Sequence, residues 1–563
     1  MNSLAEFCAL LSPLPLPEEM RAWDAHAAAL GMDPAILMEN AGHVACDVLL
    51  RHCPDVAGAP VWLLMGSGNN GGDAACIARL LAERGARALL FHARPLEAAS
   101  GASALHLSLA RADGVRTAPL SELGCAVSAC LGGASAAPDT PTARLAAHWG
   151  PPRLLVDGLL GTGFSGTLRP EALSAIELVN TLTGRIPSCF VLAVDIPSGL
   201  NAASGTPSPV AVRAHATVSL AAAKPGLVLP AASPWVGELH VGDIGMPTPA
   251  RTPVRQYLLD GHALSALPAP DPESHKNSFG HVLVLGGAPG LSGAGHMAAA
   301  GALRAGAGLV SAAAPESALA AISGGWPEIM TVALGPRGAM EWPAEIPDDL
   351  RERLRRATAL AVGPGMGRGP DAEAFLAALL DLPERPRAVI DADALILLSR
   401  RRELLARLGP GDVLTPHPGE AAALLGTGNA RIQADRPAAL AALCGLSRAA
   451  VVLKGAGTLV GQVGAPVFLS PYAVPALAMG GSGDVLAGCV AALLAGGETR
   501  EGAALRAAAT GVVLHALAGR SLGRRFPHRG CLASELADAL PHVREALEET
   551  QANAWERRVP WPC

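Results

Sequence analysis

The sequence predicts an α/β protein built from two different domains. The chain has 563 residues, more than one hydrophobic core usually serves, and half of them are hydrophobic. Short apolar runs alternate with Ala-rich helical stretches, which favours parallel sheets covered by helices on both faces. This alternation stops near Gly245 and resumes after about Ser278. We therefore expect domains at residues 1–250 and 251–563.

The first domain contains three apolar runs that predict neighbouring strands, at 61–65, 153–157 and 190–195. A Gly-rich turn follows the first run, and a helix is predicted over 73–84. The other two runs each end in an aspartate. Because the carboxyl ends of parallel strands gather in one crevice, polar groups that follow these strands are expected to converge.

The second domain begins after a segment rich in Pro and charge, which predicts a linker and an extended lead-in. Beyond it, the alternation of apolar runs and helical stretches restarts. The two halves do not repeat each other, so two different α/β domains are expected. Predicted strands lie at 281–285, 309–314, 359–362, 388–391, 412–415 and 451–454, and predicted helices at 292–305, 484–495, 501–518 and 533–547.

The composition argues against nucleic acid and membranes as partners. Charged residues make up 16% of the chain, the formal net charge is -6, and aromatic residues are only 3%. Neither a basic surface nor rings for base stacking are therefore indicated. No apolar run of about 18 residues is free of Gly and charge, so no membrane span is expected. Residues 1–19 lack a basic start and are interrupted by Glu6, which argues against a secretory signal.

The cysteine usage indicates a reducing compartment. Eleven cysteines are scattered along the chain without any CxxC pair. We therefore expect a cytoplasmic protein with no disulfide framework and no zinc site. The expected partners are small molecules, and nothing in the sequence decides whether the chain forms a homo-oligomer.

Three loops after the strands of the first domain form one constellation. The loop 66–73 is rich in Gly and opens a helix, where backbone amides can approach an anion, although a tight turn alone would look similar. The loops 157–163 and 195–199 occupy equivalent places. The oxygens of such loops suit a hard cation, and an aspartate among them can serve instead as a general acid or base. A single aspartate at a strand end usually caps the next turn, but three loops together favour a site. The polar residues expected to converge are Asn70, Asp157, Asp195 and Ser198.

These loops, with 37–42 before them and 224–227 after them, resemble the NAD(P)H-hydrate epimerase domain over roughly residues 15–247. The resemblance implies a Rossmann-like domain that interconverts the R and S forms of hydrated NADH and NADPH. It implies a K⁺ ion bound by Asn70, Asp157 and Ser198, with Asp195 as the catalytic acid/base. The substrate-binding residues that it implies are Asn69, Asn70, Gly71, Gly72, Asp73, Gly161, Thr162, Gly163, Phe164, Ser165, Gly166, Thr167 and Asp195.

The second domain carries its most informative string at 480–486, where a Gly-rich turn opens a helix with Asp484 just inside it. Such a turn can cradle a phosphate, and Asp484 can take a proton from a hydroxyl that attacks a phosphoryl group. Alone, the string can also be an ordinary helix start. Four further strand-end segments strengthen the functional interpretation, at 363–367, 391–395, 415–420 and 453–458.

With the segment 275–280, these strings resemble the ADP- or ATP-dependent NAD(P)H-hydrate dehydratase over about residues 255–548. The resemblance implies a ribokinase-like fold in which the nucleotide activates the S-hydrate hydroxyl for loss. It implies ADP as co-substrate, giving AMP and phosphate, together with Mg²⁺, and Asp484 as the catalytic base. The implied nucleotide-binding residues are Lys454, Gly455, Ala456, Gly457, Thr458 and Gly483, and the implied substrate contacts are Ala294, Gly365, Gly367, His417 and Asp484.

The resulting hypothesis is a bifunctional repair enzyme acting on hydrated NADH and NADPH. An alternative is a small-molecule kinase of the ribokinase-like class fused to a non-catalytic Rossmann-like binding module, because such kinases share the Gly-Ser-Gly-Asp turn. The segment 415–420 and the attached first domain argue against that alternative. No residue decides between ADP and ATP.

Overall fold

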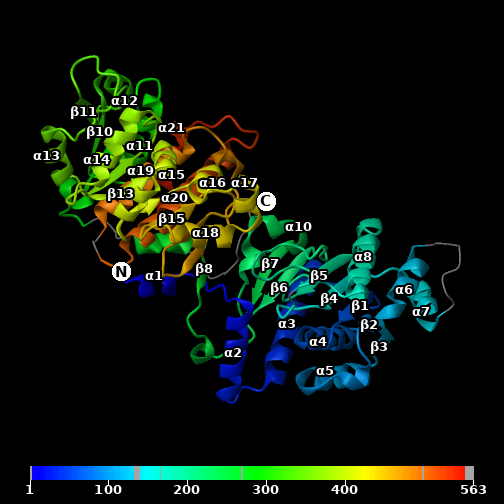
Figure 1. Cartoon of the computed structure of the whole chain (residues 1–563). Coiled ribbons are helices and arrows are strands. Elements are labelled where there is room, and N and C mark those ends of the chain that lie inside the picture. Colours follow the sequence, from blue (N-terminus) through cyan, green and yellow to red (C-terminus); the bar gives the residue numbers. More distant parts are fainter. Residues whose placement is uncertain (1–2, 132–139, 165, 268–270, 498–499, 552–563) are drawn as a thin grey trace. The chain divides into compact units, whose positions relative to one another are not determined.

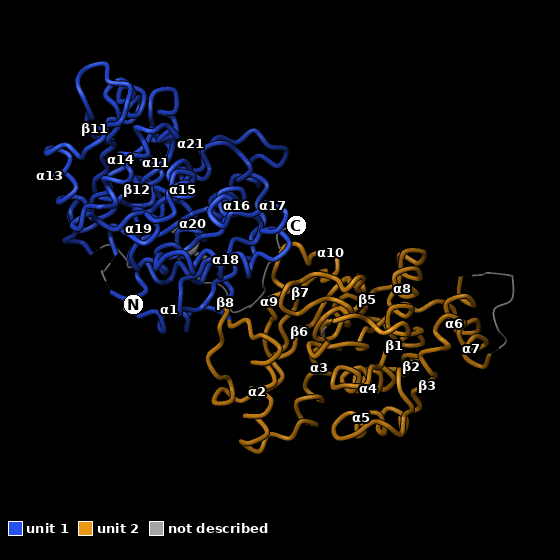
Figure 2. The backbone as a smooth tube through the Cα atoms, viewed as in Figure 1, with its two compact units in different colours: residues 1–12, 257–557, 562 blue, residues 13–256, 558–561, 563 orange. Residues whose placement is uncertain are grey.

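The structure is a computed structural model that describes residues 3–131, 140–164, 166–267, 271–497 and 500–551. It divides into two compact units, shown in Figure 2. Unit 2 comprises residues 13–256, and unit 1 comprises residues 3–12 together with 257–551. Each unit contains its own sheet flanked by helices, so the predicted two-domain α/β class is confirmed.

Unit 2 is built on a seven-stranded sheet in the order β3-β2-β1-β4-β5-β6-β7, and all its paired strands are parallel. The chain moves outward from β1 to β3 and then returns to β4, so the strand order reverses between β1 and β4. Ligands of open parallel sheets bind at such a reversal, outside the carboxyl ends of the strands. The strands are β1 (Pro60–Met65), β2 (Arg87–His92), β3 (Arg116–Pro119), β4 (Leu154–Gly158), β5 (Phe190–Val194), β6 (Ala216–Leu220) and β7 (Glu238–Gly242).

Helices cover the sheet of unit 2, with α3, α4 and α5 lying side by side on one face (Figure 1). Trp62 and Leu64 of β1 and Leu155 of β4 point to the opposite face, where they join a core with residues of α6 and α8. The helices are α2 (Pro17–Ala29), α3 (Pro34–His52), α4 (Asn69–Glu83), α5 (Gly101–Ala112), α6 (Leu123–Cys130), α7 (Pro141–Trp149), α8 (Pro170–Arg185), α9 (Pro225–Val228) and α10 (Ser233–Val236).

Unit 1 contains a ten-stranded sheet in the order β11-β10-β9-β12-β13-β14-β15-β16-β17-β8. Its strands from β11 to β15 pair in parallel, and β15, β16 and β17 pair antiparallel. The strands are β8 (Gln256–Leu258), β9 (His281–Leu285), β10 (Leu309–Pro315), β11 (Ile329–Leu334), β12 (Ala359–Val362), β13 (Arg387–Ile390), β14 (Val413–Leu414), β15 (Ala450–Leu453), β16 (Leu459–Gly461) and β17 (Val467–Leu469).

A layer of mostly apolar helices covers one face of this sheet, where α19 packs closely against α11 and α20. Gly488 allows the close approach of α19 to α11, because a Cβ there would collide with the carbonyl oxygen of Ala298. The helices of unit 1 are α1 (Leu4–Leu10), α11 (Ser292–Arg304), α12 (Leu319–Ile322), α13 (Asp348–Arg356), α14 (Pro370–Leu380), α15 (Asp393–Arg400), α16 (Pro418–Leu425), α17 (Asn429–Ala434), α18 (Arg436–Cys444), α19 (Ser482–Gly496), α20 (Ala503–Arg525) and α21 (Ala533–Gln551).

Two helix boundaries differ from the predicted ones for identifiable reasons. α4 begins at Asn69 rather than at residue 73, so the Asn-Asn-Gly-Gly run forms the first helical turn. α20 runs seven residues past the predicted end, through Gly519. A Cβ at Gly519 would collide with the Leu477 side chain, so this glycine serves helix packing and does not end the helix.

The N-terminal helix α1 belongs to unit 1, whereas a division at residue 250 leaves it in the first domain. Phe7 is fully buried, and its ring meets that of Phe468 edge to face with 5.4 Å between ring centroids. The amide of Leu258 also donates a hydrogen bond to the Ser12 carbonyl at 2.9 Å. The contact between two phenylalanine rings and a backbone hydrogen bond thus attach residues 3–12 to the rest of unit 1.

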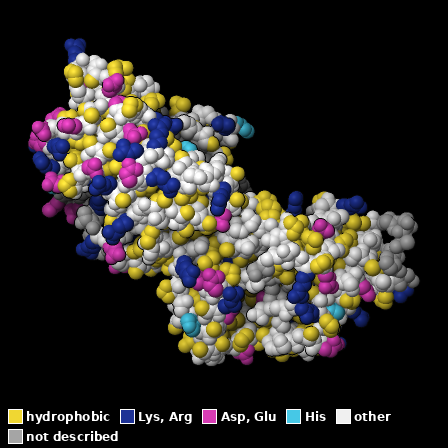
Figure 3. Space-filling view, in the orientation of Figure 1, with side chains coloured by type: hydrophobic (Ala, Val, Ile, Leu, Met, Phe, Trp, Pro, Cys, Tyr) yellow, Lys and Arg dark blue, Asp and Glu magenta, His cyan; other side chains and the backbone are white. Residues whose placement is uncertain are grey.

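Two surface properties bear on the expected partners. Among the described residues, no helix has both the length and the apolar character that crossing a bilayer would require. On the face shown in Figure 3, basic and acidic side chains are interspersed in each unit, without an extended basic patch on that face.

Candidate active sites

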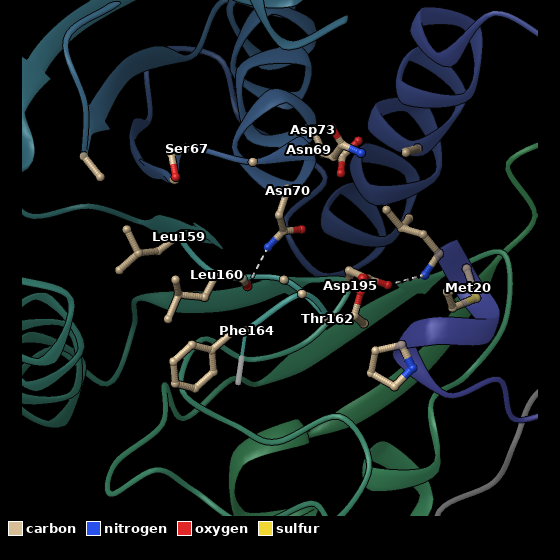
Figure 4. Close-up of a pocket in the computed structure, with 18 of the residues that line it drawn as sticks. Met20, Ser67, Asn69, Asn70, Asp73, Leu159, Leu160, Thr162, Phe164 and Asp195 are labelled. Carbon is tan, nitrogen blue, oxygen red and sulfur yellow. Dashed lines mark hydrogen bonds between the residues drawn. The ribbon is translucent and has the colours of Figure 1, made fainter. Parts of the chain in front are cut away.

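A cavity of about 770 Å³ opens in unit 2 where the sheet order reverses. Figure 4 shows its polar wall, formed by the start of α4, the loop after β4 and the residue after β5. Nine of the residues expected to bind substrate line it. They are Asn69, Asn70, Asp73, Gly161, Thr162, Gly163, Phe164, Thr167 and Asp195.

The three residues expected to bind a cation lie in one hydrogen-bonded chain. Asn70 Nδ2 donates to the Leu160 carbonyl at 2.8 Å, and the Leu160 amide donates to Ser198 Oγ at 2.8 Å. Ser198 Oγ and the Ser198 amide donate to the two oxygens of Asp157 at 2.6 and 2.7 Å. The structure therefore brings together side chains from α4, β4 and the loop after β5.

The donor set of this group fits a hard cation. Asn70 is buried, and its Oδ1 has no hydrogen-bond partner among the residues that the structure describes. Burial raises the pKa of Asp157 to about 6, although its hydrogen bonds from Ser198 oppose the shift. An amide oxygen without a partner beside a fully buried carboxyl group is an arrangement that a bound cation would stabilise.

Asp195 occupies a strained backbone position next to a buried lysine. Its φ angle is +63°, a left-handed conformation that non-glycine residues adopt mainly where the surrounding structure imposes it. Its carboxylate accepts a short hydrogen bond from Lys224 Nζ and another from the Leu220 amide at 3.2 Å. Lys224 is 1% exposed and also donates to Ser219 Oγ and the Leu220 carbonyl. The lysine thus fixes the Asp195 carboxylate at the cavity wall.

Two further carboxyl groups line the same cavity. Burial, followed by the charge of Asp195, raises the pKa of Asp73 well above its usual range, and both causes also raise the pKa of Asp24. Lys224 acts against both shifts. Three carboxyl groups therefore lie near one ammonium group. Such an environment favours the protonated form of some of these groups and the ionised form of others.

Three other residues expected to contact substrate in unit 2, Gly71, Gly72 and Gly166, are not among the described residues that line the cavity. A Cβ at Gly71 would collide with the Gly66 carbonyl oxygen, and one at Gly72 would lie 2.6 Å from Met38 Sδ. These two glycines therefore permit close packing of α4, and their contact with substrate stays a prediction. Gly166 is also absent from the lining, and Ser165 lies outside the described residues.

The second site lies in unit 1 around an ion pair between Lys454 and Asp391. Lys454 Nζ donates to Asp391 Oδ1 at 2.6 Å and lies 3.8 Å from Glu420 Oε2. Asp391 is 1% exposed. Burial alone would lower the pKa of Lys454, but the Asp391 and Glu420 carboxylates raise it. The ammonium group therefore stays charged at the carboxyl ends of β13 and β15.

Asp484 stands in the first turn of α19, beside this ion pair. Burial, and then the charge of Asp391, raises the pKa of Asp484 to about 7, while Lys454 opposes the shift. A Cβ at the preceding Gly483 would lie 3.4 Å from Lys454 Nζ, so the backbone at this helix start faces the ammonium group. A carboxyl group with a pKa near neutrality is suited to act as a general base.

His417 caps the start of α16 with its imidazole ring. Its Nδ1 accepts hydrogen bonds from the amides of Gly419 and Glu420 at 2.9 and 3.3 Å, which leaves Nε2 as the protonated nitrogen. That Nε2 lies 3.2 Å from Glu420 Oε1. Partial burial and the charge of Lys454 lower the pKa of His417. The neutral ring is therefore held beside the Lys454 cluster.

The other residues expected to contact the hydrate come from neighbouring loops. Gly365 has a φ of +59°, and a Cβ there would lie 2.8 Å from Ala294 Cβ. The Gly367 amide donates to Asp393 Oδ2 at 3.0 Å, and the charge of Asp393 contributes to the raised pKa of Asp484. The loop after β12 therefore packs against the start of α11 and bonds to Asp393, whose charge reaches Asp484.

Hydrogen bonds from Arg436 hold the backbone of residues 454–458, the loop expected to bind the nucleotide. Arg436 donates to the carbonyls of Leu453, Lys454 and Gly457 at 3.0 to 3.3 Å. Gly457 itself has a left-handed φ of +67°. The loop therefore presents a fixed backbone next to Lys454.

Comparisons with known proteins match both units of the chain. The family model described as NAD(P)H-hydrate dehydratase matches residues 282–542, and the one described as YjeF-related protein N-terminus matches residues 34–226. The bifunctional NAD(P)H-hydrate repair enzyme Nnr of Moorella thermoacetica is 37% identical over 94% of this chain and 96% of its own length. The chain belongs to the family of bifunctional NAD(P)H-hydrate repair enzymes. The family resemblance predicted from the motifs is thus confirmed.

The chain is also similar to a second curated relative and to one solved structure. The Nnr protein of Coxiella burnetii is 33% identical over 93% of this chain and 97% of its own length. Among solved structures, the ADP/ATP-dependent NAD(P)H-hydrate dehydratase of Bacillus subtilis, co-crystallised with ATP and Mg²⁺, is 27% identical, with a TM-score of 0.41. That likeness covers 51% of this chain and 96% of the Bacillus subtilis chain.

Sequence reasoning missed several charged residues of both sites in this repair enzyme. Lys224, Asp391 and Glu420 lie in strings that the motifs included, but no role was predicted for them. Asp24, on α2, and His515, on α20, lie in no motif. His515 is fully inside α20, and burial lowers its pKa to about 4 while its Nε2 donates to the Ser482 carbonyl at 2.9 Å. The ring thus supports the turn before Asp484, a tertiary contact without a sequence signal.

Proposed function

We propose that this chain repairs hydrated NADH and NADPH in two steps. Unit 2 interconverts the R and S hydrates, and unit 1 dehydrates the S form at the expense of ADP, giving AMP and phosphate. The observation that carries the proposal is that Asp195 pairs with Lys224, and that Asp484 lies beside the Lys454–Asp391 ion pair at the carboxyl ends of β13 and β15. Two lysine-balanced carboxyl clusters in one chain fit two proton-transfer sites.

In unit 2, Asp195 is the proposed acid/base residue for epimerisation. Its carboxylate is fixed by Lys224 and lines the cavity that would receive the hydrated nicotinamide. Asp73, whose pKa burial raises, would hold its proton there and donate a hydrogen bond to the substrate. Asn70, Asp157 and Ser198 would hold K⁺, which would supply a fixed positive charge for the anionic part of the substrate.

In unit 1, Asp484 is the proposed base for dehydration. It would take the proton of the hydrate hydroxyl as that oxygen bonds to the terminal phosphorus of ADP and AMP leaves. The carbon–oxygen bond would then break and release phosphate, and loss of a proton from the adjacent ring carbon to solvent would regenerate the dihydronicotinamide. Lys454 would balance the phosphate charge, and residues 455–458 with Gly483 would hold the nucleotide together with Mg²⁺. The hydrate would lie against Ala294, Gly365, Gly367 and His417.

The proposed setting is the cytoplasm, with hydrated NADH, hydrated NADPH and ADP as small-molecule partners. All ten cysteines that the structure describes are free, as the reducing cytoplasm would keep them.

The decisive experiment supplies the full chain with ADP and separated R or S hydrates and follows the return of dihydronicotinamide absorbance. The unaltered chain is expected to restore both hydrates. D195N is expected to restore only the S form, and D484N neither form. A small-molecule kinase would leave the absorbance unchanged with every substrate, and R-hydrate repair by D195N at the unaltered rate would remove the epimerase assignment for unit 2.

A further inference from the structure

Three chemically different ligand groups meet in unit 2 away from the cavity's catalytic residues. Glu39 of α3, Cys76 of α4 and His106 of α5 each present one ligand atom, and these atoms all lie within 4.8 Å of one another. Cys76 is fully buried, His106 is 2% exposed, and the Glu39 side chain is 34% exposed. Neither proposed reaction uses these side chains.

Two of the three distances between the ligand atoms match those of a tetrahedral zinc site, and the third is at most 4.8 Å. Cys76 Sγ lies 3.6 Å from Glu39 Oε2, and His106 Nδ1 lies 3.5 Å from the same oxygen. Ordinary zinc bond lengths place sulfur and oxygen ligands about 3.6 Å apart, and nitrogen and oxygen ligands about 3.4 Å apart, around a tetrahedral ion. The side chains would therefore need little movement to hold the ion.

The imidazole of His106 is oriented as a metal ligand would be. Its Nε2 lies 3.1 Å from the Ala35 carbonyl, which can only accept, so Nε2 carries the proton. Nδ1 then presents a lone pair toward Glu39 and Cys76, and it has no hydrogen-bond partner among the residues that the structure describes. Zinc-bound histidines commonly donate their second nitrogen to a carbonyl in this way. A buried lone pair without a donor is costly unless a ligand satisfies it.

We propose that Glu39, Cys76 and His106 bind a Zn²⁺ ion that joins α3, α4 and α5. Thiolate, imidazole and carboxylate together suit zinc better than Mg²⁺ or Ca²⁺, which prefer oxygen ligands alone. The thiol proton of Cys76 is released to solvent on binding. A water molecule reaching the site along the partly exposed Glu39 side chain completes the coordination.

Arg79 places a second positive charge close to the proposed ion. Its NH2 nitrogen donates to both Glu39 oxygens, at 2.5 and 2.7 Å, and lies 3.9 Å from Cys76 Sγ. Its other terminal nitrogen pairs with Glu83. Glu39 and the Cys76 thiolate would balance Zn²⁺, while Glu83 would balance Arg79. The guanidinium then keeps Glu39 Oε1 and leaves Oε2 to the ion.

This site would overturn the expectation that the chain holds no zinc. That expectation considered only closely spaced cysteine pairs, whereas the three ligands here lie on three helices and are 37 and 30 residues apart along the chain. The ion would also connect to the cavity wall, because Met38 and Asp73, which line the cavity, are one and three residues from Glu39 and Cys76 respectively.

The test uses the full chain, stripped with a chelator and titrated with Zn²⁺ and separately with Co²⁺. Binding of Co²⁺ is expected to give the thiolate-to-cobalt charge-transfer band and the strong visible bands of a tetrahedral ion. Zn²⁺ at about 100 times its Kd is expected to raise the Tm of unit 2 by about 5 °C or more. Absence of the thiolate band in the unaltered chain would overturn the proposal without any variant.

Matched variants identify the ligands. C76A and H106Q are each expected to bind one Zn²⁺ fewer than the unaltered chain and to lose the Tm increase. C46A removes another fully buried cysteine, from α3. It is expected to keep both the Zn²⁺ stoichiometry and the Tm increase of the unaltered chain. A second group, His52, Glu238 and His240, also has ligand spacing, so the readout is the difference between variants. Equal stoichiometry in C76A and C46A would refute the site.

Discussion

Lys454 Nζ donates a 2.6 Å hydrogen bond to Asp391 Oδ1, and this pair determines the charge around Asp484. The lysine favours ionised carboxylates nearby, while Asp391 disfavours them. Together with burial, the balance leaves both Asp484 and Glu420 with a pKa of about 7. The site therefore changes its protonation state within the physiological pH range.

The first prediction concerns the pH dependence of dehydration. A base must be ionised, so kcat/KM for the S hydrate should fall about tenfold per pH unit below about 7 and level off above it. D484N should remove this fall in kcat/KM, the acidic limb of the pH profile, together with most of the activity. E420Q should keep the limb but move it to lower pH, because the Glu420 charge raises the pKa of Asp484. An unchanged limb in D484N would exclude Asp484 as the base.

The second prediction concerns the buried lysine of unit 2. K224M should lower the local free energy of unfolding by about 3 kcal/mol or more, because it leaves the Asp195 carboxylate without its ammonium partner. Hydrogen exchange of β5 and β6 in the full chain measures the effect. K276M removes an exposed lysine and serves as the control. Equal exchange in the two variants would contradict the assigned role of Lys224.

The third prediction links Asp157 to pH and K⁺. Its folded pKa of about 6 exceeds the unfolded value of 3.8, so the protonated carboxyl group stabilises the fold at low pH. This contribution, about 3 kcal/mol, is lost as pH rises from about 4 through about 6. Relative to D157N, the unaltered chain should therefore become less stable over this range in choline chloride.

Potassium should reverse that loss, because a cation favours the ionised carboxylate. Hydrogen exchange of β4 above pH of about 6 should slow in KCl for the unaltered chain and change less for D157N. If KCl and choline chloride give the same exchange in the unaltered chain, the ion does not bind at Asn70, Asp157 and Ser198.

The fourth prediction separates two glycines of unit 1. A methyl group at Gly483 would lie 3.4 Å from Lys454 Nζ, where the phosphates are proposed to bind, without a backbone clash. G483A should thus raise the KM for ADP at least about tenfold, equivalent to about 1.4 kcal/mol, with the Tm unchanged.

Gly363 provides the contrasting variant. Its φ is +114°, and a Cβ there would collide with the Asp391 carbonyl oxygen. G363A should therefore lower the Tm as well as the activity. A lowered Tm in G483A, or an unchanged one in G363A, would show that these glycines have other roles.

The sequence predicted those site residues that follow from strand ends. Asp157 and Asp195 each come at or just after a parallel strand, and a Gly-rich helix start marks Asp484, so local pattern was sufficient for them. Asp24 and His515 reach the sites from separate helices, which depends on tertiary packing that no local pattern records. The close packing at Gly71 and Gly72 could not be predicted either, because a glycine needed for helix packing looks the same in sequence as one that faces a ligand.

The attachment of α1 to unit 1 has a consequence for how the protein is made. Phe7 is synthesised before unit 2, yet its partner Phe468 follows after all of unit 2 and most of unit 1. Residues 3–12 therefore lack their final contacts until the ribosome has synthesised Phe468. A truncated gene beginning at residue 251 would lack this segment, so a separately expressed dehydratase should be supplied with residues 3–12 as a peptide or by circular permutation.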